Sequence, residues 1–203
     1  CRRSGNCAAG LETGDLQLKF ASYNIHKAVG ADRRRDADRI LRVVRELDAD
    51  ILALQEVDRR FGRRVTVLPR LLVEEQGYNI VPVALRPASM GWHGNAILVR
   101  RGIEILHGDR VHLPTIEPRG AVRAELALKG KRLRVAGMHL DLSGLRRRDQ
   151  IRAVLSELDD CKPPCPAVLL GDFNEWSLRG GSMREFTRDW QPVAPGRSFP
   201  SGQ

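Results

Sequence analysis

The chain has 203 residues, 42% of them apolar and 29% charged, which is typical of a single globular domain with a full core. No stretch approaches the ~18 consecutive apolar residues of a transmembrane helix, so we expect no transmembrane segment. The net charge of +9 indicates an anionic partner, either nucleic acid or a phospholipid surface, unless the arginine excess reflects coding composition alone.

The N-terminal quarter of the chain predicts a strand followed by a helix. Residues 1–15 are polar and glycine-rich, and we expect them to be disordered. Residues 16–23 alternate between apolar and polar side chains, as a β-strand does. Residues 36–47 carry one apolar stripe with arginines on the opposite face, which predicts an amphipathic helix capped by Asp36 or Asp32.

The middle of the chain is dominated by strand-like runs. Residues 51–54 are typical of a short buried strand, and residues 67–75 predict a helix that ends at Gly77. Further strands are expected at residues 78–83, 96–99, 103–111, 121–128 and 133–138. Gly130 lies in a hairpin turn between the last two of these strands.

The C-terminal part returns to alternating elements. Residues 145–158 predict a second long helix, residues 167–170 a buried strand, and residues 177–190 a short helix. Hairpins mixed with crossover helices are typical of an α/β fold with mixed sheets and helices packed outside them. The arginine clusters at 33–35 and 146–148 are expected to be solvated helix ends, unless they bind an anion.

Polar side chains gather where the expected strands end. Because side chains at positions i and i+2 of a strand share a face, four strand ends each present a polar pair. The pairs are Asn24 with His26, His93 with Asn95, His139 with Asp141, and Asp172 with Asn174, and Glu56 closes a fifth strand. Polar groups of these types are costly to bury without partners, so we expect one shared site at one edge of the sheets.

This set of residues fits the hydrolysis of a phosphoester bond. Mg²⁺ (or Mn²⁺) prefers a few oxygen ligands, and we expect Glu56 to bind it with Asn24 beside it. Asp172 and Asn174 are expected to orient the attacking water, and His139 to donate a proton or a hydrogen bond to the phosphate.

The remaining polar residues near these strand ends are candidates for contact with the substrate. They are His26, His93, Asn95 and Arg119. Arg123, four positions after Arg119, could also reach a phosphate. Ordinary structural roles stay open for the whole set: Asn24 and Asp141 in turns, Glu56 on the surface, His26, His93 and His139 in packing, and Arg119 and Arg123 in salt bridges.

Three motifs in this order resemble a known superfamily. They are Ser-Tyr-Asn-Ile-His at 22–26, Leu-Gln-Glu-Val-Asp at 54–58 and Gly-Asp-Phe-Asn at 171–174. The chain resembles the metal-dependent endonuclease/exonuclease/phosphatase superfamily, which also contains sphingomyelinases and inositol phosphatases. The resemblance runs from about residue 18 to the C-terminus and implies a DNase I-like four-layer sandwich, two packed mixed β-sheets flanked by helices.

The resemblance also implies roles for individual residues. Asn24 and Glu56 stand at the positions that bind the metal, and His139 stands at the position that acts on the phosphate. Asp172 and Asn174 match the Asp and Asn of the third motif. The family normally ends with an Asp-His pair on a last strand, which this sequence lacks. We therefore expect residues 16–203 to form one domain of a native chain that continues past Gln203.

Departures from the family pattern bear on the substrate. Abasic-site endonucleases carry a lysine where Asp58 stands, and an aliphatic residue where Glu175 and Trp176 follow the third motif, so this activity is disfavoured. The Tyr-Asn-Ile-His segment is more similar to the bacterial sphingomyelinase-like and lipid-remodelling members. Trp92 and Trp176 either stack on a base or meet a lipid interface.

The sequence therefore predicts a monomeric, divalent-metal-dependent phosphodiesterase that acts on nucleic acid or on a phospholipid headgroup. Two alternatives remain: a non-catalytic binding module that keeps the fold, and a phosphatase for small molecules such as inositol or sugar phosphates. No histidine stands at zinc-finger spacing from the four cysteines, and Cys161 and Cys165 are either a disulfide or two thiols. A chain that starts at Cys1 is expected to be a fragment, a processed product or a lipid-anchored form.

Overall fold

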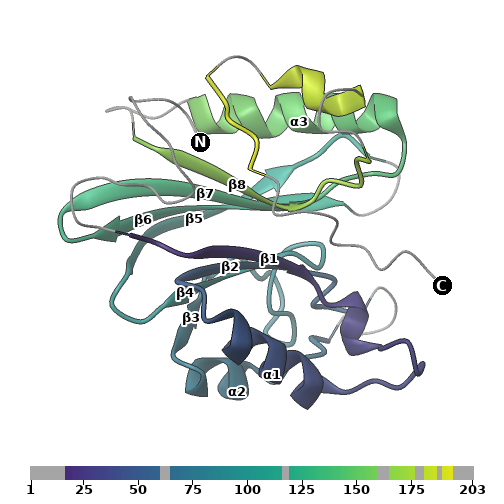
Figure 1. Ribbon diagram of the computed structural model, residues 1–203, viewed down its shortest axis with the longest axis vertical. Helices are drawn as coiled ribbons and strands as arrows, with labels where there is room; N and C mark the ends of the chain where they lie inside the picture. Colours follow the sequence, from purple (N-terminus) through teal and green to yellow (C-terminus); the bar gives the residue numbers. More distant parts are fainter. Residues whose placement is uncertain are drawn as a thin grey trace.

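The computed structural model describes residues 17–59, 65–115, 119–159, 165–176, 181–186 and 189–193. Two four-stranded sheets pack face to face, and helices cover the outer face of each (Figure 1). The helices are α1 (Ala37–Leu47) and α2 (Arg70–Glu75) on one side, and α3 (Gly144–Asp159) with the short 3₁₀ helix η2 (Gly181–Glu185) on the other. This arrangement is the four-layer α/β sandwich that the sequence predicted.

The first sheet has the strand order β1-β2-β4-β3 and is centred on a completely buried strand. Its strands are β1 (Phe20–Asn24), β2 (Ile51–Gln55), β3 (Tyr78–Ile80) and β4 (Ala96–Arg100). β1 and β2 run parallel and are connected through α1, whereas β4 is antiparallel to both β2 and β3. β2 is a continuous apolar run up to Gln55 because helices cover one of its faces and the second sheet covers the other.

The second sheet has the order β5-β6-β7-β8 and is a meander with one crossover. Its strands are β5 (Glu104–His112), β6 (Gly120–Leu128), β7 (Lys131–His139) and β8 (Ala167–Asp172). Lys129 and Gly130 join β6 to β7 with φ of 48° and 75°, the pair of positive values that a two-residue hairpin turn requires. β7 and β8 run parallel because α3 carries the chain back between them.

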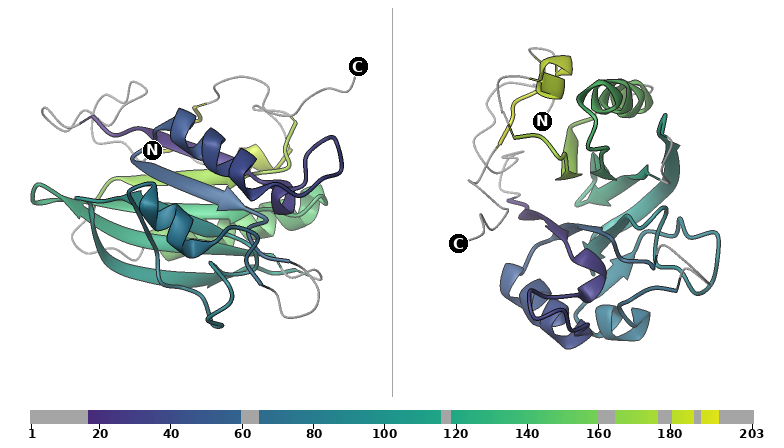
Figure 2. Two further views of the ribbon diagram at one scale, coloured as in Figure 1. Left: turned by 90° about the horizontal axis from the view of Figure 1, so that it is seen from below. Right: turned by 90° about the vertical axis from the view of Figure 1, so that its right-hand side faces the viewer.

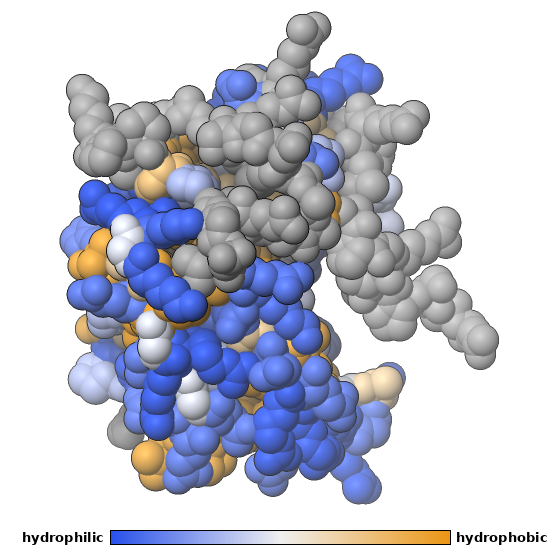
Figure 3. All heavy atoms as spheres, turned by 60° about the vertical axis from the view of Figure 1, so that its left-hand side comes forward, coloured by the Kyte–Doolittle hydropathy of each residue, from blue (hydrophilic) through white to orange (hydrophobic). Residues whose placement is uncertain are grey.

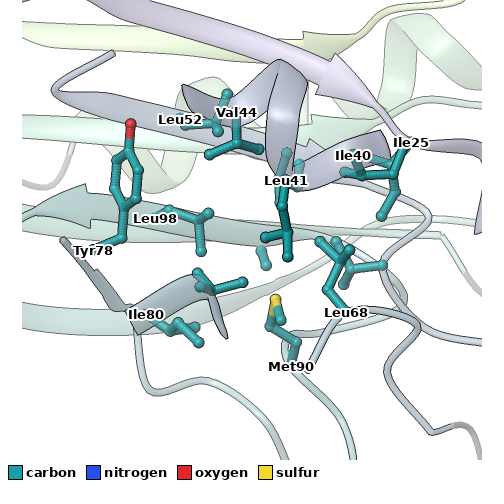
Figure 4. Packing of buried hydrophobic residues seen from close by; sticks show 14 of the residues in the cluster. Ile25, Ile40, Leu41, Val44, Leu52, Leu68, Tyr78, Ile80, Met90 and Leu98 are labelled. Carbon is teal, nitrogen blue, oxygen red and sulfur yellow. The ribbon is translucent and has the colours of Figure 1, made fainter. Parts of the chain in front are cut away.

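Apolar side chains form three layers that hold the sandwich together. Under α1, Leu41 and Val44 lie over Leu52 of β2 and Leu98 of β4 (Figure 4). Burial of such residues stabilises the fold by about 1.5–3 kcal/mol per large side chain. A second layer fills the space between the sheets, and a third lies beneath α3. Together the layers fix the two sheets relative to each other.

Helix α1 begins and ends at the residues that the sequence indicates. The carboxylate of Asp36 accepts a hydrogen bond from the backbone N of Arg39 at 2.9 Å, so Asp36 rather than Asp32 is the N-cap. Asp32 instead forms an ion pair with Arg39, with a distance of 2.8 Å from Nη2 to Oδ2. Among the described residues, no helix is long and apolar enough to span a membrane.

Several element boundaries differ from the expected ones. β1 begins at Phe20 rather than at residue 16, because the backbone N of Lys19 donates to the Asp50 carboxylate instead of to a strand. β3 ends at Ile80 rather than at residue 83, since Pro82 cannot donate to a sheet and the chain bends there. α2 begins at Arg70 rather than at residue 67, after an extended Pro69.

Some expectations fall wholly or partly outside the described residues. They are the expected disorder of residues 1–15, the expected disulfide or thiol state of Cys161, and the expected continuation of the chain past Gln203. Within the expected short helix at 177–190, the described part is the 3₁₀ helix η2 over Gly181–Glu185.

Candidate active site

The candidate site lies at one edge of both sheets, on the right-hand side in Figure 1 and facing the viewer in the right-hand view of Figure 2. The parallel strands β1 and β2 end at this edge, and so do β7 and β8 in the other sheet. β4 and β6 begin at the same edge because each is antiparallel to a strand that ends there. Sequence segments far apart in the chain therefore meet across the gap between the sheets.

A hydrogen bond between Asn24 and Asp172 joins the two sheets at this edge. Nδ2 of Asn24 donates to Oδ2 of Asp172 at 3.0 Å, although the two residues are 148 positions apart in the chain. Oδ1 of Asn24 accepts from the backbone N of His26 at 3.0 Å, and Oδ1 of Asp172 accepts from the backbone N of Asn174 at 3.0 Å. Each strand thus ends in the same side-chain-to-backbone turn, and the two turns face each other.

These turns correct one prediction. The polar pairs do not lie on one face of a strand, because β1, β7 and β8 end at the first residue of each pair. His26 and Asn174 follow in left-handed backbone, with φ of 47° and 48°. His93 and Asn95 precede β4 and lie in a turn. The pairs still reach one edge, but turns bring them there and strand alternation does not.

Gly171 explains why the third motif begins with glycine. Its φ is 148°, and a Cβ at this position would lie 2.0 Å from the backbone O of Met138 in the neighbouring strand β7. No larger residue fits without moving β8. The close approach of the two backbones sets His139 directly beside Asp172 in the strand register.

His139 lies next to the Asp172 carboxylate in a largely enclosed position. Its Nε2 is 3.8 Å from Oδ2 of Asp172, and its side chain is 12% exposed. Asn174 closes the same corner, since its Nδ2 donates to the backbone O of Leu140 at 2.8 Å. The three residues thus share a compact corner at the ends of β7 and β8.

Glu56 follows the buried strand β2 and is held ionised by nearby positive charge. Burial alone would raise the pKa of its carboxyl group, but the Lys27 ammonium and the nearby His139 and His26 outweigh burial and lower that pKa. Nζ of Lys27 lies 2.7 Å from Oε2 of Glu56, and the two side chains are 30% and 20% exposed. Glu56 therefore presents a half-buried anionic oxygen at the edge.

Unfavourable backbone geometry is concentrated at this edge. Six non-glycine residues with positive φ lie there: His26, Lys27, Ala28, Glu56, His93 and Asn174. Each such residue costs of order 1–3 kcal/mol, and such geometry persists only where the surrounding structure imposes it. Strained residues of this kind cluster at functional sites in proteins, which supports the assignment of this edge as the site.

The turn that contains His93 and Asn95 borders Glu56. The backbone N of Val57 donates to the O of Gly94 at 3.0 Å. Asn95 is 1% exposed, and its Nδ2 donates to the backbone O of Gly120 at 2.8 Å, so its amide ties this turn to the start of β6. Arg119 directly precedes that strand, and the ring of His93 contacts Trp92 edge-on at 4.1 Å between centroids.

Two residues with open roles have structural contacts. Arg123 forms ion pairs with Asp109 and with Glu157. Asp141 stabilises the turn before α3, because its Oδ1 accepts from the backbone N of Ser143 at 2.9 Å. The structural interpretation of these two residues is therefore confirmed.

Sequence reasoning missed two parts of this edge. Lys27 attracted no attention because its partner Glu56 is distant in the chain, although a lysine directly after Asn-Ile-His was a usable signal. Arg147 was expected to be solvated, yet its side chain is 10% exposed. Its Nη2 is 3.3 Å from Oε2 of Glu175, and its Nη1 donates to the backbone O of Leu142 at 2.6 Å. The guanidinium thus braces two loops beside the site.

The donor set at this edge fits a Mg²⁺-type cation. Among the described residues, no group of three or more His, Cys, Asp or Glu side chains is placed to hold a metal. Mg²⁺ does not require one, because it commonly binds one or two carboxylates and keeps several waters. Glu56 already carries a cation, the Lys27 ammonium, and Oδ1 of Asn24 supplies a further oxygen at this edge.

A separate hollow of about 530 Å³ lies at the other end of β1 and β2. It is lined by Gln17, Leu18, Lys19, Asp48, Asp50 and Arg100 and shares no residue with the candidate site. The left-hand side of the molecule is mostly hydrophilic, with scattered apolar side chains (Figure 3). Neither feature brings metal-binding and proton-transferring groups together as the site edge does.

Comparison with known proteins agrees with the fold and with the motifs at this edge. A sequence profile of the Endonuclease/Exonuclease/phosphatase family matches residues 21–201, nearly the whole chain. The chain belongs to this family. The uncharacterized protein YbhP of Escherichia coli (strain K12) is 28% identical over 208 residues, which cover 93% of this chain and 81% of YbhP.

Several solved structures share the fold. A humanized TDP2 from D. rerio superimposes with a TM-score of 0.61 at 19% identity, over 78% of this chain and 66% of that one. The human Nocturnin catalytic domain gives 0.62 at 21% identity, over 82% and 67%. An endonuclease/exonuclease/phosphatase from Beutenbergia cavernae gives 0.57 at 26% identity, over 78% and 48%. The chain thus spans about half to two thirds of these structures.

Proposed function

We propose that this protein is a divalent-metal-dependent hydrolase of phosphoester bonds, and specifically a phosphodiesterase. The observation that carries the proposal is the Asn24–Asp172 hydrogen bond, which draws the ends of both sheets into one site. Around it stand an ionised carboxylate, a largely enclosed imidazole and two strained turns. Membership of a phosphoesterase family supports the same reaction class.

Glu56 and Asn24 are the proposed metal ligands. The carboxylate of Glu56 is ionised at neutral pH because neighbouring positive groups lower its pKa, despite the opposing effect of burial. A Mg²⁺ or Mn²⁺ ion bound there would polarise a phosphoryl oxygen and offset charge on the leaving oxygen. Oδ1 of Asn24 is fixed in direction by the backbone N of His26, so it is oriented before any ion arrives.

Asp172 and His139 are the proposed catalytic pair. Asp172 accepts the proton of the water that attacks phosphorus, and Asn24 and Asn174 hold its two carboxylate oxygens in place for this task. His139, at 3.8 Å from that carboxylate, donates a hydrogen bond to a non-bridging phosphate oxygen as negative charge builds up there. The bond between phosphorus and the leaving oxygen breaks as the bond to water forms.

Nucleic acid is the first candidate substrate. The chain carries a net charge of +9, and the exposed Arg33, Arg34 and Arg35 lie in the loop between β1 and α1, which starts at the site edge. His26, His93 and Arg119 are the proposed substrate contacts. Among the solved relatives, a D. rerio TDP2 structure is complexed with a single-strand DNA product.

A phospholipid headgroup is the second candidate, favoured by exposed apolar side chains next to the site. Trp176 is 86% exposed two residues after Asn174, and Leu142 is 73% exposed three residues after His139. Leu145 adds a further exposed apolar side chain at the start of α3. Large apolar groups beside a site commonly insert at a lipid surface or stack on a base.

Hydrolysis of bis-p-nitrophenyl phosphate with and without Mg²⁺ or Mn²⁺ tests the proposed reaction. We expect turnover only with metal, and loss of turnover in Glu56→Gln and His139→Ala but not in Lys129→Gln, a change at the distant hairpin. Metal binding without turnover would favour a binding module, and turnover of monoesters alone would favour a small-molecule phosphatase.

A further inference from the structure

The geometry points to Lys27 as a displaceable cation. We propose that its ammonium pairs with the Glu56 carboxylate in the metal-free protein. When a divalent cation binds that carboxylate, the ammonium moves to the phosphate group of the substrate. This inference rests on the proposed metal-dependent function and adds a residue to it. Three observations carry it: the ion pair, the strained turn that presents Lys27, and the anchoring of that turn.

The first observation is that Lys27 takes the position a metal would need. Its Nζ lies 2.7 Å from Oε2 of Glu56, the carboxylate that the site offers to a cation. A second positive charge at the same oxygen repels the ammonium, so the divalent ion and Lys27 compete for Glu56. The pair also keeps the half-buried carboxylate partnered, and thus prevents an uncompensated negative charge in the metal-free protein.

The second observation is the backbone that presents Lys27. His26, Lys27 and Ala28 all have positive φ, at 47°, 53° and 62°, in the short 3₁₀ turn η1 (His26–Ala28). Non-glycine residues rarely adopt this conformation even singly, and three in succession are unfavourable. An ion pair between side chains that are 30% and 20% exposed offsets only part of the cost of three such residues. The turn therefore indicates that the position of Lys27 serves the site and does not serve stability.

The third observation is that the backbone of the turn is anchored independently of the ion pair between Lys27 and Glu56. Ala28 is 2% exposed, and the backbone O of Lys27 accepts from Nε of Arg35 at 3.1 Å. The backbone N of Asp36 donates to the O of Ala28 at 2.9 Å. Because the Cα of Lys27 is fixed, a displaced ammonium stays at the site edge. The partly buried ammonium then needs a new anion, and the phosphate of the substrate is the one that arrives there.

The test measures binding and not turnover. Calorimetric titration of the metal-free chain with Mg²⁺ gives the metal affinity, and titration of the Mg²⁺-saturated chain with inorganic phosphate gives the anion affinity. We expect Lys27→Gln to bind Mg²⁺ about three- to tenfold more tightly and phosphate at least about threefold more weakly. Opposite changes are the signature of displacement, because a damaged site would lose both affinities.

Lys129→Gln is the matched control. Lys129 also has left-handed backbone, with φ of 48°, but it lies in the β6–β7 hairpin at the opposite end of the sheets. Its substitution should change neither affinity. Lys27→Arg, which keeps the charge, should restore phosphate binding, and thermal melting verifies that each variant is folded.

Three results would each overturn the inference, and they are distinguishable. If Glu56→Gln bound Mg²⁺ as the unmodified chain does, the metal would not use Glu56, and the proposed metal site would fail together with the inference. If Glu56→Gln lost Mg²⁺ but Lys27→Gln left the Mg²⁺ affinity unchanged or lower, the metal site would stand and displacement of Lys27 would be refuted. Tighter Mg²⁺ binding with unchanged phosphate binding would refute the role of Lys27 toward phosphate.

Discussion

Replacing Arg147 with methionine should destabilise the protein far more than an ordinary surface substitution. The side chains of Arg147 and Glu175 are 10% and 9% exposed, and Oε2 of Glu175 also accepts from the N and Oγ of Ser182. Removing Arg147 takes the charge of its guanidinium away from this buried carboxylate, and it also removes a hydrogen bond to the backbone O of Leu142. Loss of one partner of a buried pair costs about 3–5 kcal/mol.

Equilibrium unfolding in urea, followed by tryptophan fluorescence, measures this cost. With a slope of about 2–3 kcal/mol per molar urea, Arg147→Met should lower the midpoint by roughly 1–2 M. Arg152→Met is the matched control on the same helix. Arg152 pairs with Glu185 at 2.7 Å but is 60% exposed, so its loss should cost less than about 1 kcal/mol.

A double variant separates the lost charge pair from lost packing. Glu175→Gln keeps the size of the side chain and its acceptor oxygen but removes the buried charge. Arg147→Met combined with Glu175→Gln should therefore be less destabilised than the sum of the two single variants. An equal loss in the free energy of unfolding for Arg147→Met and Arg152→Met would refute the assignment of a buried ion pair. Strict additivity of these losses in the double variant would refute it too.

Three further predictions address the motif glycine, acid stability and the apolar rim. Gly171→Ala should abolish turnover and lower the melting temperature by more than about 10 °C, because the Cβ would lie 2.0 Å from the backbone O of Met138; unchanged melting would contradict that contact. Burial opposes ionisation of Asp109, but Arg123 and His107 lower its pKa below the ordinary 3.8, so its stabilising effect is complete above that pH and is lost on acidification below it. Asp109→Asn should therefore flatten the fall in stability between about pH 4 and pH 2, as measured by thermal melting, and an unchanged slope would count against it. If the substrate is a phospholipid, Trp176→Ala should weaken sedimentation of the protein with anionic vesicles without changing bis-p-nitrophenyl phosphate turnover. A steep loss of oligonucleotide binding as the salt concentration rises would instead favour a nuclease.

Local sequence patterns were sufficient for most of the fold. The amphipathic stripe of α1 and the Asp36 cap lie within a few residues of each other, so the pattern contains all the information needed. The apolar run of β2 is equally explicit, because a strand buried on both faces carries mostly apolar residues. Errors arose at boundaries such as residue 16 and Pro82, where the hydrogen-bond partner of the backbone decides where a strand begins or ends.

The candidate site was predictable in its residue types but not in its connections. Strand-end polarity led to Asn24, Glu56, His139, Asp172 and Asn174, and the structure brings these residues to one edge. Left-handed turns, which the pattern of side chains does not reveal, set their directions.

Two contacts show why this information is missing from the sequence. Lys27 meets Glu56, and Arg147 meets Glu175, only because separate loops converge in three dimensions. An arginine in a basic cluster looks solvated until its distant partner is known.

The Asn24–Asp172 hydrogen bond also determines when, during synthesis and folding, the candidate site can form. The two residues are separated by 148 positions, and one belongs to the first strand and the other to the last described strand. A nascent chain therefore cannot complete this site until most of its length has left the ribosome and both sheets have docked. Contacts so distant in sequence form slowly, since a long loop must close first. The contact between the ends of the two sheets is thus absent from partly made or partly folded chains.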